Sequence, residues 1–167
     1  MNPELYVFRD LDGFTPHISR LVCMMNFVRH ETLEATSNLN QHQLDYLISP
    51  DSNSIAMLLA HIANLEKWWQ SHIFEGNTTF WQTPANLSGS ERTSIKGQPL
   101  SFYLDELSTT REKTLEELQK RDDAWLHETA PFFSNGKLMN NYFKWFHVLE
   151  DEINHRGQIL LIRRLIT

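Results

Sequence analysis

Cysteine is nearly absent from this sequence: Cys23 is the only one among 167 residues. A single thiol cannot form a disulfide within the chain, which is typical of proteins from reducing compartments, and Cys23 is expected to be a small core residue. No run approaches the roughly 20 apolar residues that a membrane-spanning helix needs. The first residues also lack the apolar core of a secretion signal. These absences predict a cytoplasmic protein with no membrane partner.

Positive charge is also scarce. The formal net charge is -6 at pH 7, and the sequence pI is about 5.7. A nucleic-acid-binding domain is expected to carry a dense basic patch. The basic group near the end of the sequence, Arg156, Arg163 and Arg164, is too short to form one. The sequence therefore predicts no nucleic-acid partner.

Several familiar catalytic signatures are missing. The sequence contains no glycine-rich phosphate loop, no nucleophile elbow and no paired-cysteine zinc motif. It also has no internal repeat. Enzymes that depend on these motifs are therefore disfavoured.

The residues that are present indicate one helical domain over 1–167. Hydrophobic residues make up 41% of the chain and charged residues 22%, which is an ordinary globular balance. Apolar residues recur at helical spacing in four segments: 16–39, 51–74, 101–121 and 141–164. This pattern predicts an all-α four-helix bundle.

Local signals refine the helix ends. Thr15 before Pro16 predicts an N-cap for the first helix, and polar residues 51–54 supply N-cap candidates for the second. Phe102 is expected on the buried face of the third helix, with the leucines of that segment. Residues 76–100 predict a long crossing between the second and third helices.

Shorter elements are expected in the connections. Residues 42–47 predict a short helical piece. Asn135-Gly136 is a tight-turn signal that favours a small hairpin between the third and fourth helices.

The last helix carries the residues with the clearest chemistry. His147, Asp151 and His155 follow one another at intervals of four. Residues at i and i+4 share one face of a helix, roughly 5–6 Å apart, so two of them can reach one metal ion. His61 lies on the apolar face of the second helix and is the best candidate for a ligand from another element. A buried histidine there needs a partner.

Taken alone, each of these signals has a plainer interpretation. His61 by itself is more often a hydrogen-bonded core residue, and an i, i+4 pair is often a local hydrogen bond. Glu66 and Glu150 are either groups that support the site or surface charges, with surface favoured for Glu150. Gln158 is a further candidate to support a ligand.

At these positions the sequence resembles the DinB family, also described as DinB/YfiT-like. The hallmark of the last helix is His155-Arg156-Gly157-Gln158, and the segment 53–63 resembles the second-helix motif with its histidine. The resemblance covers nearly the whole chain. It implies an up-down-down-up four-helix bundle.

The resemblance also implies a metal site of three histidines, which fall on His61, position 151 and His155. Here position 151 is aspartate. Two histidines and a carboxylate still suit one divalent ion, Zn, Ni, Fe or Mn. His147 is an additional or replacement ligand, and loss of metal binding is the alternative.

Three functions stay open from the sequence. Related families include enzymes that use small thiols, which implies a metal-dependent transferase acting on a thiol and an electrophile. Arg156 and Arg29 are candidates to bind such a substrate. The alternatives are a metal-dependent hydrolase, with Glu66 or Glu150 as the base, and a non-catalytic metal-binding stress-response protein. The family often dimerises, so a homodimer is expected.

Overall fold

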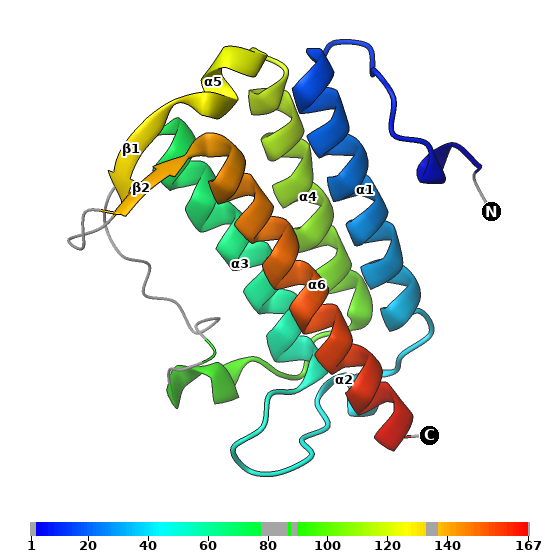
Figure 1. Ribbon diagram of the computed structural model, residues 1–167. Coiled ribbons are helices and arrows are strands. Elements are labelled where there is room, and N and C mark those ends of the chain that lie inside the picture. Colours follow the sequence, from blue (N-terminus) through cyan, green and yellow to red (C-terminus); the bar gives the residue numbers. More distant parts are fainter. Residues whose placement is uncertain (1–2, 78–86, 88–89, 133–136, 167) are drawn as a thin grey trace.

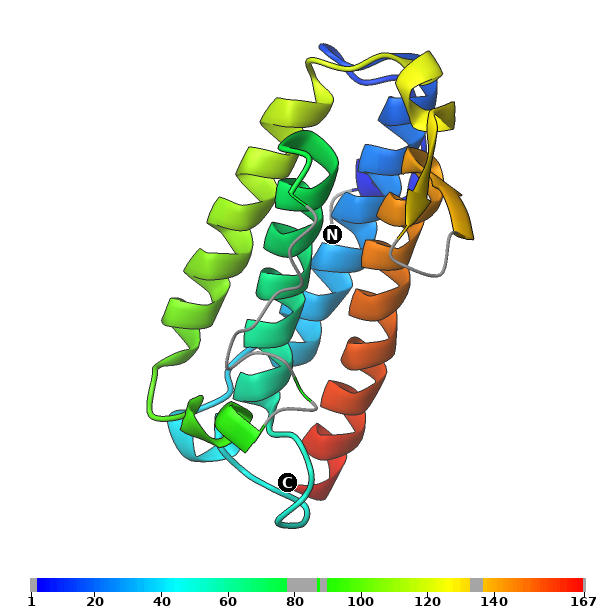
Figure 2. The same cartoon turned by 90° about the vertical axis from the view of Figure 1, so that its left-hand side faces the viewer.

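Four long helices form the body of the protein (Figure 1). The computed structural model describes residues 3–77, 87, 90–132 and 137–166. The helices are α1 (Pro16–Thr36), α3 (Ile55–Phe74), α4 (Leu100–Leu118) and α6 (Asn141–Leu165). Helices α1 and α6 run in one direction and α3 and α4 in the other, as Figures 1 and 2 show from two sides. This arrangement confirms the predicted up-down-down-up bundle.

Shorter elements lie at the ends and along the side of the bundle. They are η1 (Pro3–Tyr6), α2 (Gln41–Leu44), η2 (Ser90–Ser94), α5 (Asp123–His127), β1 (Thr129–Phe132) and β2 (Lys137–Asn140). The two strands pair antiparallel, with Thr129 opposite Asn140, so the predicted hairpin is present. Its predicted turn, Asn135-Gly136, lies outside the described residues. Among the residues that the structure describes, no helix is long and apolar enough to cross a membrane.

The long helices begin where polar residues satisfy their first backbone N–H groups. Ser54 accepts a hydrogen bond from the N–H of Met57, which confirms the predicted start of α3. Thr15 is the N-cap residue of α1 and Pro16 follows it, as predicted, but the Thr15 side chain makes no capping hydrogen bond. Asp123 of α5 caps the helix instead, accepting from the N–H groups of His17 at 3.0 Å and Ile18 at 3.3 Å.

The inner face of α4 differs from the prediction at one position. Phe102 is 46% exposed, whereas its neighbour Tyr103 is 2% exposed. The two rings meet edge to face, with centroids 5.3 Å apart. Successive helical residues point about 100° apart, and the buried face passes through Tyr103, Leu107 and Leu118. Phe102 therefore lies beside this face and covers its edge.

The core consists of two hydrophobic clusters. One cluster contains Trp145, Trp69 and Leu118, near the end of the bundle where α6 begins. The other contains Leu58, Tyr103 and Ile159, near the end where α3 and α4 begin. Near the boundary between the two clusters, each long helix carries a buried charged residue. The centre of the bundle is therefore ionic.

Each long helix contributes one residue to this charged layer, which is made of Arg29 (α1), Glu66 (α3), Arg111 (α4) and Glu152 (α6). None of the four is more than 8% exposed. Arg29 donates to Glu152 at 2.8 Å and to Glu66 at 3.0 Å. Arg111 donates to Glu66 at 2.8 Å and to Glu152 at 3.3 Å. Two positive and two negative charges thus balance inside the bundle.

Neutral groups complete the hydrogen bonding of the layer. Thr114 donates to Glu66 at 2.7 Å. Arg29 also donates to the Leu107 carbonyl, and Arg111 to the Met25 carbonyl. Burial alone would raise the pKa of Glu66, but Arg111, Arg29 and Thr114 lower it to about 2. Glu66 is therefore an anion at neutral pH.

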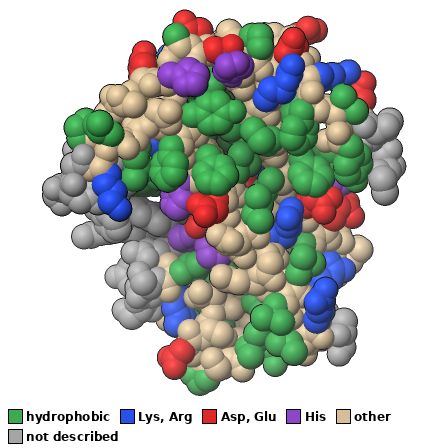
Figure 3. Space-filling view, in the orientation of Figure 1, with side chains coloured by type: hydrophobic (Ala, Val, Ile, Leu, Met, Phe, Trp, Pro, Cys, Tyr) green, Lys and Arg blue, Asp and Glu red, His purple; other side chains and the backbone are tan. Residues whose placement is uncertain are grey.

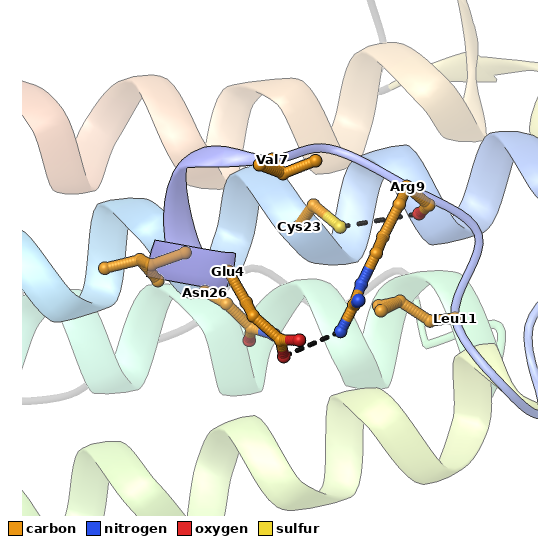
Figure 4. A pocket seen from close by; sticks show the side chains of 7 residues that line it. Glu4, Val7, Arg9, Leu11, Cys23 and Asn26 are labelled. Carbon is orange, nitrogen blue, oxygen red and sulfur yellow. Dashed lines mark hydrogen bonds and ion pairs between the residues drawn. The ribbon is translucent and has the colours of Figure 1, made fainter. Parts of the chain in front are cut away.

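The N-terminal segment packs over α1 and covers Cys23, as Figure 4 shows. The thiol donates to the Arg9 carbonyl oxygen at 3.6 Å. Arg9 itself pairs with Glu4 at the surface. Cys23 is 9% exposed and behaves as the small core residue that the sequence predicts.

Candidate metal centre

Three potential ligands converge between α3 and α6. His61 lies in the first half of α3, and Asp151 and His155 are one turn apart on α6. One ligand atom from each lies within 4.8 Å of the others. His61 is 8% exposed, and the other two side chains are mostly buried. The three residues singled out from the sequence are therefore neighbours in space.

The spacing of this cluster suits a single metal ion. His61 Nε2 lies 3.5 Å from Asp151 Oδ2, and His155 Nε2 lies 3.4 Å from Asp151 Oδ1. Two ligands at roughly 2.1 Å from a metal in tetrahedral geometry lie roughly 3.4 Å apart. The two imidazole rings are nearly perpendicular, with centroids 4.8 Å apart. Little rearrangement would be needed to hold an ion.

Asp151 provides the test of whether the residues fit a metal. Its Oδ2 is buried and has no hydrogen-bond partner among the described residues. Its recorded partner is His61 Nε2, at 3.5 Å. A buried anionic oxygen with no closer donor is costly, and a divalent cation would remove that cost. Two imidazoles and one carboxylate form a donor set that Zn, Ni, Fe and Mn all accept. The residues present therefore fit the ion.

The electrostatics show strong mutual attraction within the cluster. Burial would raise the pKa of Asp151, but His155 and His61 together hold it well below the ordinary range. Burial would lower the pKa of His155, but the neighbouring Asp151 raises it. The Asp151 carboxylate is thus held in its ionised form by the two imidazoles beside it.

Gln158 is placed to support a ligand. Its Oε1 lies 3.4 Å from Nδ1 of His155, one turn further along α6. A hydrogen bond from Nδ1–H to this oxygen leaves Nε2 free to face Asp151. Metal-binding histidines commonly have their second nitrogen held in this way. The position of Gln158 agrees with the supporting role predicted for it.

His147 lies one turn before Asp151, outside the three-residue cluster. Its Nδ1 is 3.2 Å from Glu150 Oε2, and both side chains are largely exposed. Its ring meets the Trp69 ring edge to face, with centroids 5.9 Å apart. The structure thus places His147 beside the candidate site, with the exposed Glu150 as its partner.

Two predicted site residues belong elsewhere. Glu66 binds Arg29, Arg111 and Thr114 in the charged layer, and none of its hydrogen bonds reaches the cluster. It is therefore neither a support for the ligands nor an available base. Arg29 was predicted to bind substrate, but all three nitrogens of its buried guanidinium donate to protein groups. These bonds place Arg29 in the charged layer, and a role toward a substrate stays a prediction.

Arg156 stays a prediction as a substrate-binding residue. Its Nη1 is buried and has no hydrogen-bond partner among the described residues. Five helical residues separate it from Asp151, which puts it about 140° around the helix. It therefore lies on a different face of α6 from the three candidate ligands.

Sequence reasoning missed Arg111 and Glu152, the other half of the charged layer. Arg111 continues the buried stripe of Leu107 and Leu118 on α4. Glu152 lies in the stripe of Trp145 and Ile159 on α6. A charged residue at a position that helical spacing assigns to the core was the signal available.

The bundle and its cluster define a DinB-like helical protein, as the resemblance implied. The chain matches the mycothiol-S-transferase family over residues 20–167. It therefore belongs to that family, which is DinB-like.

A solved structure supports the fold independently. The chain resembles a conserved protein from Enterococcus faecalis with a TM-score of 0.67 and 15% sequence identity. The match covers 85% of this chain and 92% of that one. At this identity the likeness establishes the fold alone. No curated protein matches the chain.

Proposed function

We propose that this protein binds one divalent metal ion through His61, Asp151 and His155 and transfers a low-molecular-weight thiol to a small electrophile. The observation that carries the proposal is the Asp151 carboxylate, whose two oxygens lie 3.5 Å from His61 Nε2 and 3.4 Å from His155 Nε2 in one mostly buried cluster. Membership of the mycothiol-S-transferase family supports the thiol as one substrate. The family's name makes mycothiol the first thiol to test.

A divalent ion at this position would supply Lewis acidity, lowering the pKa of a thiol that binds it. The protein's own residues would hold the ion and shape its surroundings. Asp151 would neutralise one positive charge, and Gln158 would orient the His155 ring. In the transfer, sulfur forms a bond to carbon while the leaving group departs with its electron pair. The thiol proton passes to solvent. The single buried cysteine is consistent with a cytoplasmic setting for this reaction.

Thiol transfer is tested with protein reconstituted with each of Zn²⁺, Ni²⁺, Fe²⁺ and Mn²⁺. The substrates are mycothiol or another small thiol and 1-chloro-2,4-dinitrobenzene, and the thioether product is followed by absorbance. We expect metal-dependent acceleration that disappears in Asp151→Ala, because the ion is then lost. Glu150→Gln should keep its activity.

Two outcomes would count against a transferase. Stoichiometric metal without acceleration by any thiol would contradict it. Ester hydrolysis that needs metal but no thiol, and that is lost in Glu150→Gln, would favour the hydrolase with Glu150 as its base.

We also propose a homodimer formed through the outer face of α6. Phe146, Ile153 and Leu160 recur at intervals of seven on this face and are 50%, 43% and 40% exposed. Hydrophobic side chains spread over the side of the molecule where α1 and α6 lie (Figure 3). An exposed apolar stripe of this kind is typical of an interface, and two copies of one helix face can bury each other.

Light scattering after size exclusion tests the dimer. The wild-type protein should give twice the chain mass, and Ile153→Glu should give the monomer mass, because a charge cannot be buried in the stripe without a partner. Leu138→Glu is the matched control, since Leu138 is 71% exposed on β2. A wild-type monomer at all practical concentrations would contradict the proposal.

A further inference from the structure

A second cavity lies away from the candidate metal centre, under the β1–β2 hairpin. It has a volume of about 320 Å³, within the size range of small-molecule sites. The end of α3, the helix α5, strand β1 and the start of α6 all contribute to its lining. Figure 1 shows the hairpin at the end of the bundle where α3 ends and α6 begins.

Lys144 is the unusual residue in this lining. It is 5% exposed, and its Nζ donates to Oδ1 of Asn141 at 3.1 Å. No carboxylate forms an ion pair with it among the residues that the structure describes. Burial lowers its pKa, and no neighbouring charge opposes that effect. A buried lysine is normally paired with an acid.

The hydrogen bonding around Lys144 leaves donors available. Asn141 uses its Nδ2 to donate to the Trp125 carbonyl and its Oδ1 to accept from Lys144. An ammonium group has three donors, so two remain for another acceptor. Trp125, Ile73 and Pro131 supply apolar and aromatic surface in the same cavity. A cation without an ion-pair partner beside this aromatic and apolar surface matches a small anion with an apolar body.

We propose that this cavity binds a small carboxylate with a flat apolar body, whose carboxylate accepts from Lys144. The one carboxylate among the lining residues is that of Glu128, which is exposed and forms no ion pair with Lys144. Glu128 is thus available as a matched control. The site does not depend on metal binding, because His61, Asp151 and His155 are not in its lining.

Lys144 nevertheless lies on the same face of α6 as Asp151 of the candidate metal centre. Lys144 precedes Asp151 by seven residues, which is two helical turns and roughly 10 Å. A molecule bound at Lys144 would lie near the metal centre without coordinating it.

The proposal is tested by titrating the full-length protein with benzoate and with its neutral analogue benzamide. Backbone amide signals of Thr129 and Ala130 report on the cavity by nuclear magnetic resonance. We expect saturable shifts with benzoate and binding of benzamide weaker by about tenfold or more, because only benzoate gains the charged hydrogen bond. In Lys144→Met, the affinity for benzoate should fall by about tenfold, while the affinity for benzamide should not change. Glu128→Gln should keep or tighten benzoate binding.

Several results would overturn the proposal. One is equal affinity for benzoate and benzamide, and another is unchanged benzoate affinity in Lys144→Met. A third is the absence of a saturable shift at Thr129 and Ala130 in folded wild-type protein. Benzoate binding that is lost in His155→Ala but kept in Lys144→Met would assign the anion to the metal centre and also overturn it. Because metal content is measured separately, failure here leaves the metal proposal unaffected.

Discussion

Replacing Glu66 by glutamine will lower the free energy of unfolding by about 3 to 5 kcal/mol, because it leaves buried arginine charge without its partner. Glu66 is 0% exposed and accepts hydrogen bonds from Arg29, Arg111 and Thr114. Removing its charge leaves two guanidinium groups facing the single carboxylate of Glu152 in the core. Urea denaturation of wild type and variant measures the difference.

The matched control is Lys67→Met, next to Glu66 in sequence. Lys67 pairs with Glu106 on the surface, where the two side chains are 42% and 46% exposed. Exposed pairs contribute about 0 to 1 kcal/mol. A Glu66→Gln variant as stable as Lys67→Met would contradict the account of an ionic centre.

The pH dependence of stability gives a second readout of the same layer. The folded-state pKa of Glu66 is lowered from 4.5 to about 2. A lowered folded pKa adds stability that is fully present above the unfolded value, near 4.5, and is lost as the pH falls toward 2. At about 1.4 kcal/mol for each pH unit of difference, roughly 3 kcal/mol should disappear in this window. Glu66→Gln should show a shallower decline.

Substituting any one of His61, Asp151 and His155 by alanine will abolish stoichiometric zinc binding. Each of the three supplies one ligand atom within 4.8 Å of the others, and two remaining ligands cannot hold the ion firmly. We expect the affinity to fall by about a hundredfold or more in each variant, because even supporting residues change it by 10 to 100-fold. Elemental analysis measures the zinc content of each variant, and competition with a chelator measures its zinc affinity.

A thermal shift provides an independent check on the same variants. Zinc at about a hundred times its dissociation constant stabilises a folded protein by roughly 2.7 kcal/mol. It should therefore raise the melting temperature of wild type and leave the three alanine variants unchanged. His147→Ala is the matched control on α6, and it should keep both metal and thermal shift. Loss of metal in His147→Ala with retention in Asp151→Ala would make His147 the ligand instead.

Much of this fold could be predicted from sequence because its signals are local. Helical spacing of apolar residues located all four long helices, and the polar run 51–54 marked the start of α3, where Ser54 is the N-cap. The Asp151–His155 pair needed only the i, i+4 geometry of one helix. His61 was found because a histidine on an apolar face needs a partner. These inferences require no knowledge of how distant segments pack.

The charged layer and the cap of α1 could not be predicted in this way. Arg29 and Glu66 were first placed near a substrate or a metal, because a charge inside a helix has no visible partner in sequence. Their partners come from other helices, 123 positions away for Arg29 and Glu152. Asp123 caps α1 from 106 positions away. Long-range pairing of this kind depends on tertiary packing, which local patterns do not contain.

The most direct test of the central claim is an anomalous difference map from crystals of the zinc-reconstituted protein, with data collected on both sides of the zinc edge. We expect one strong peak between α3 and α6, within about 2.3 Å of His61 Nε2, His155 Nε2 and an Asp151 carboxylate oxygen. A peak beside His147 and Glu150 would contradict the account, as would a fully reconstituted crystal with no peak at the three residues.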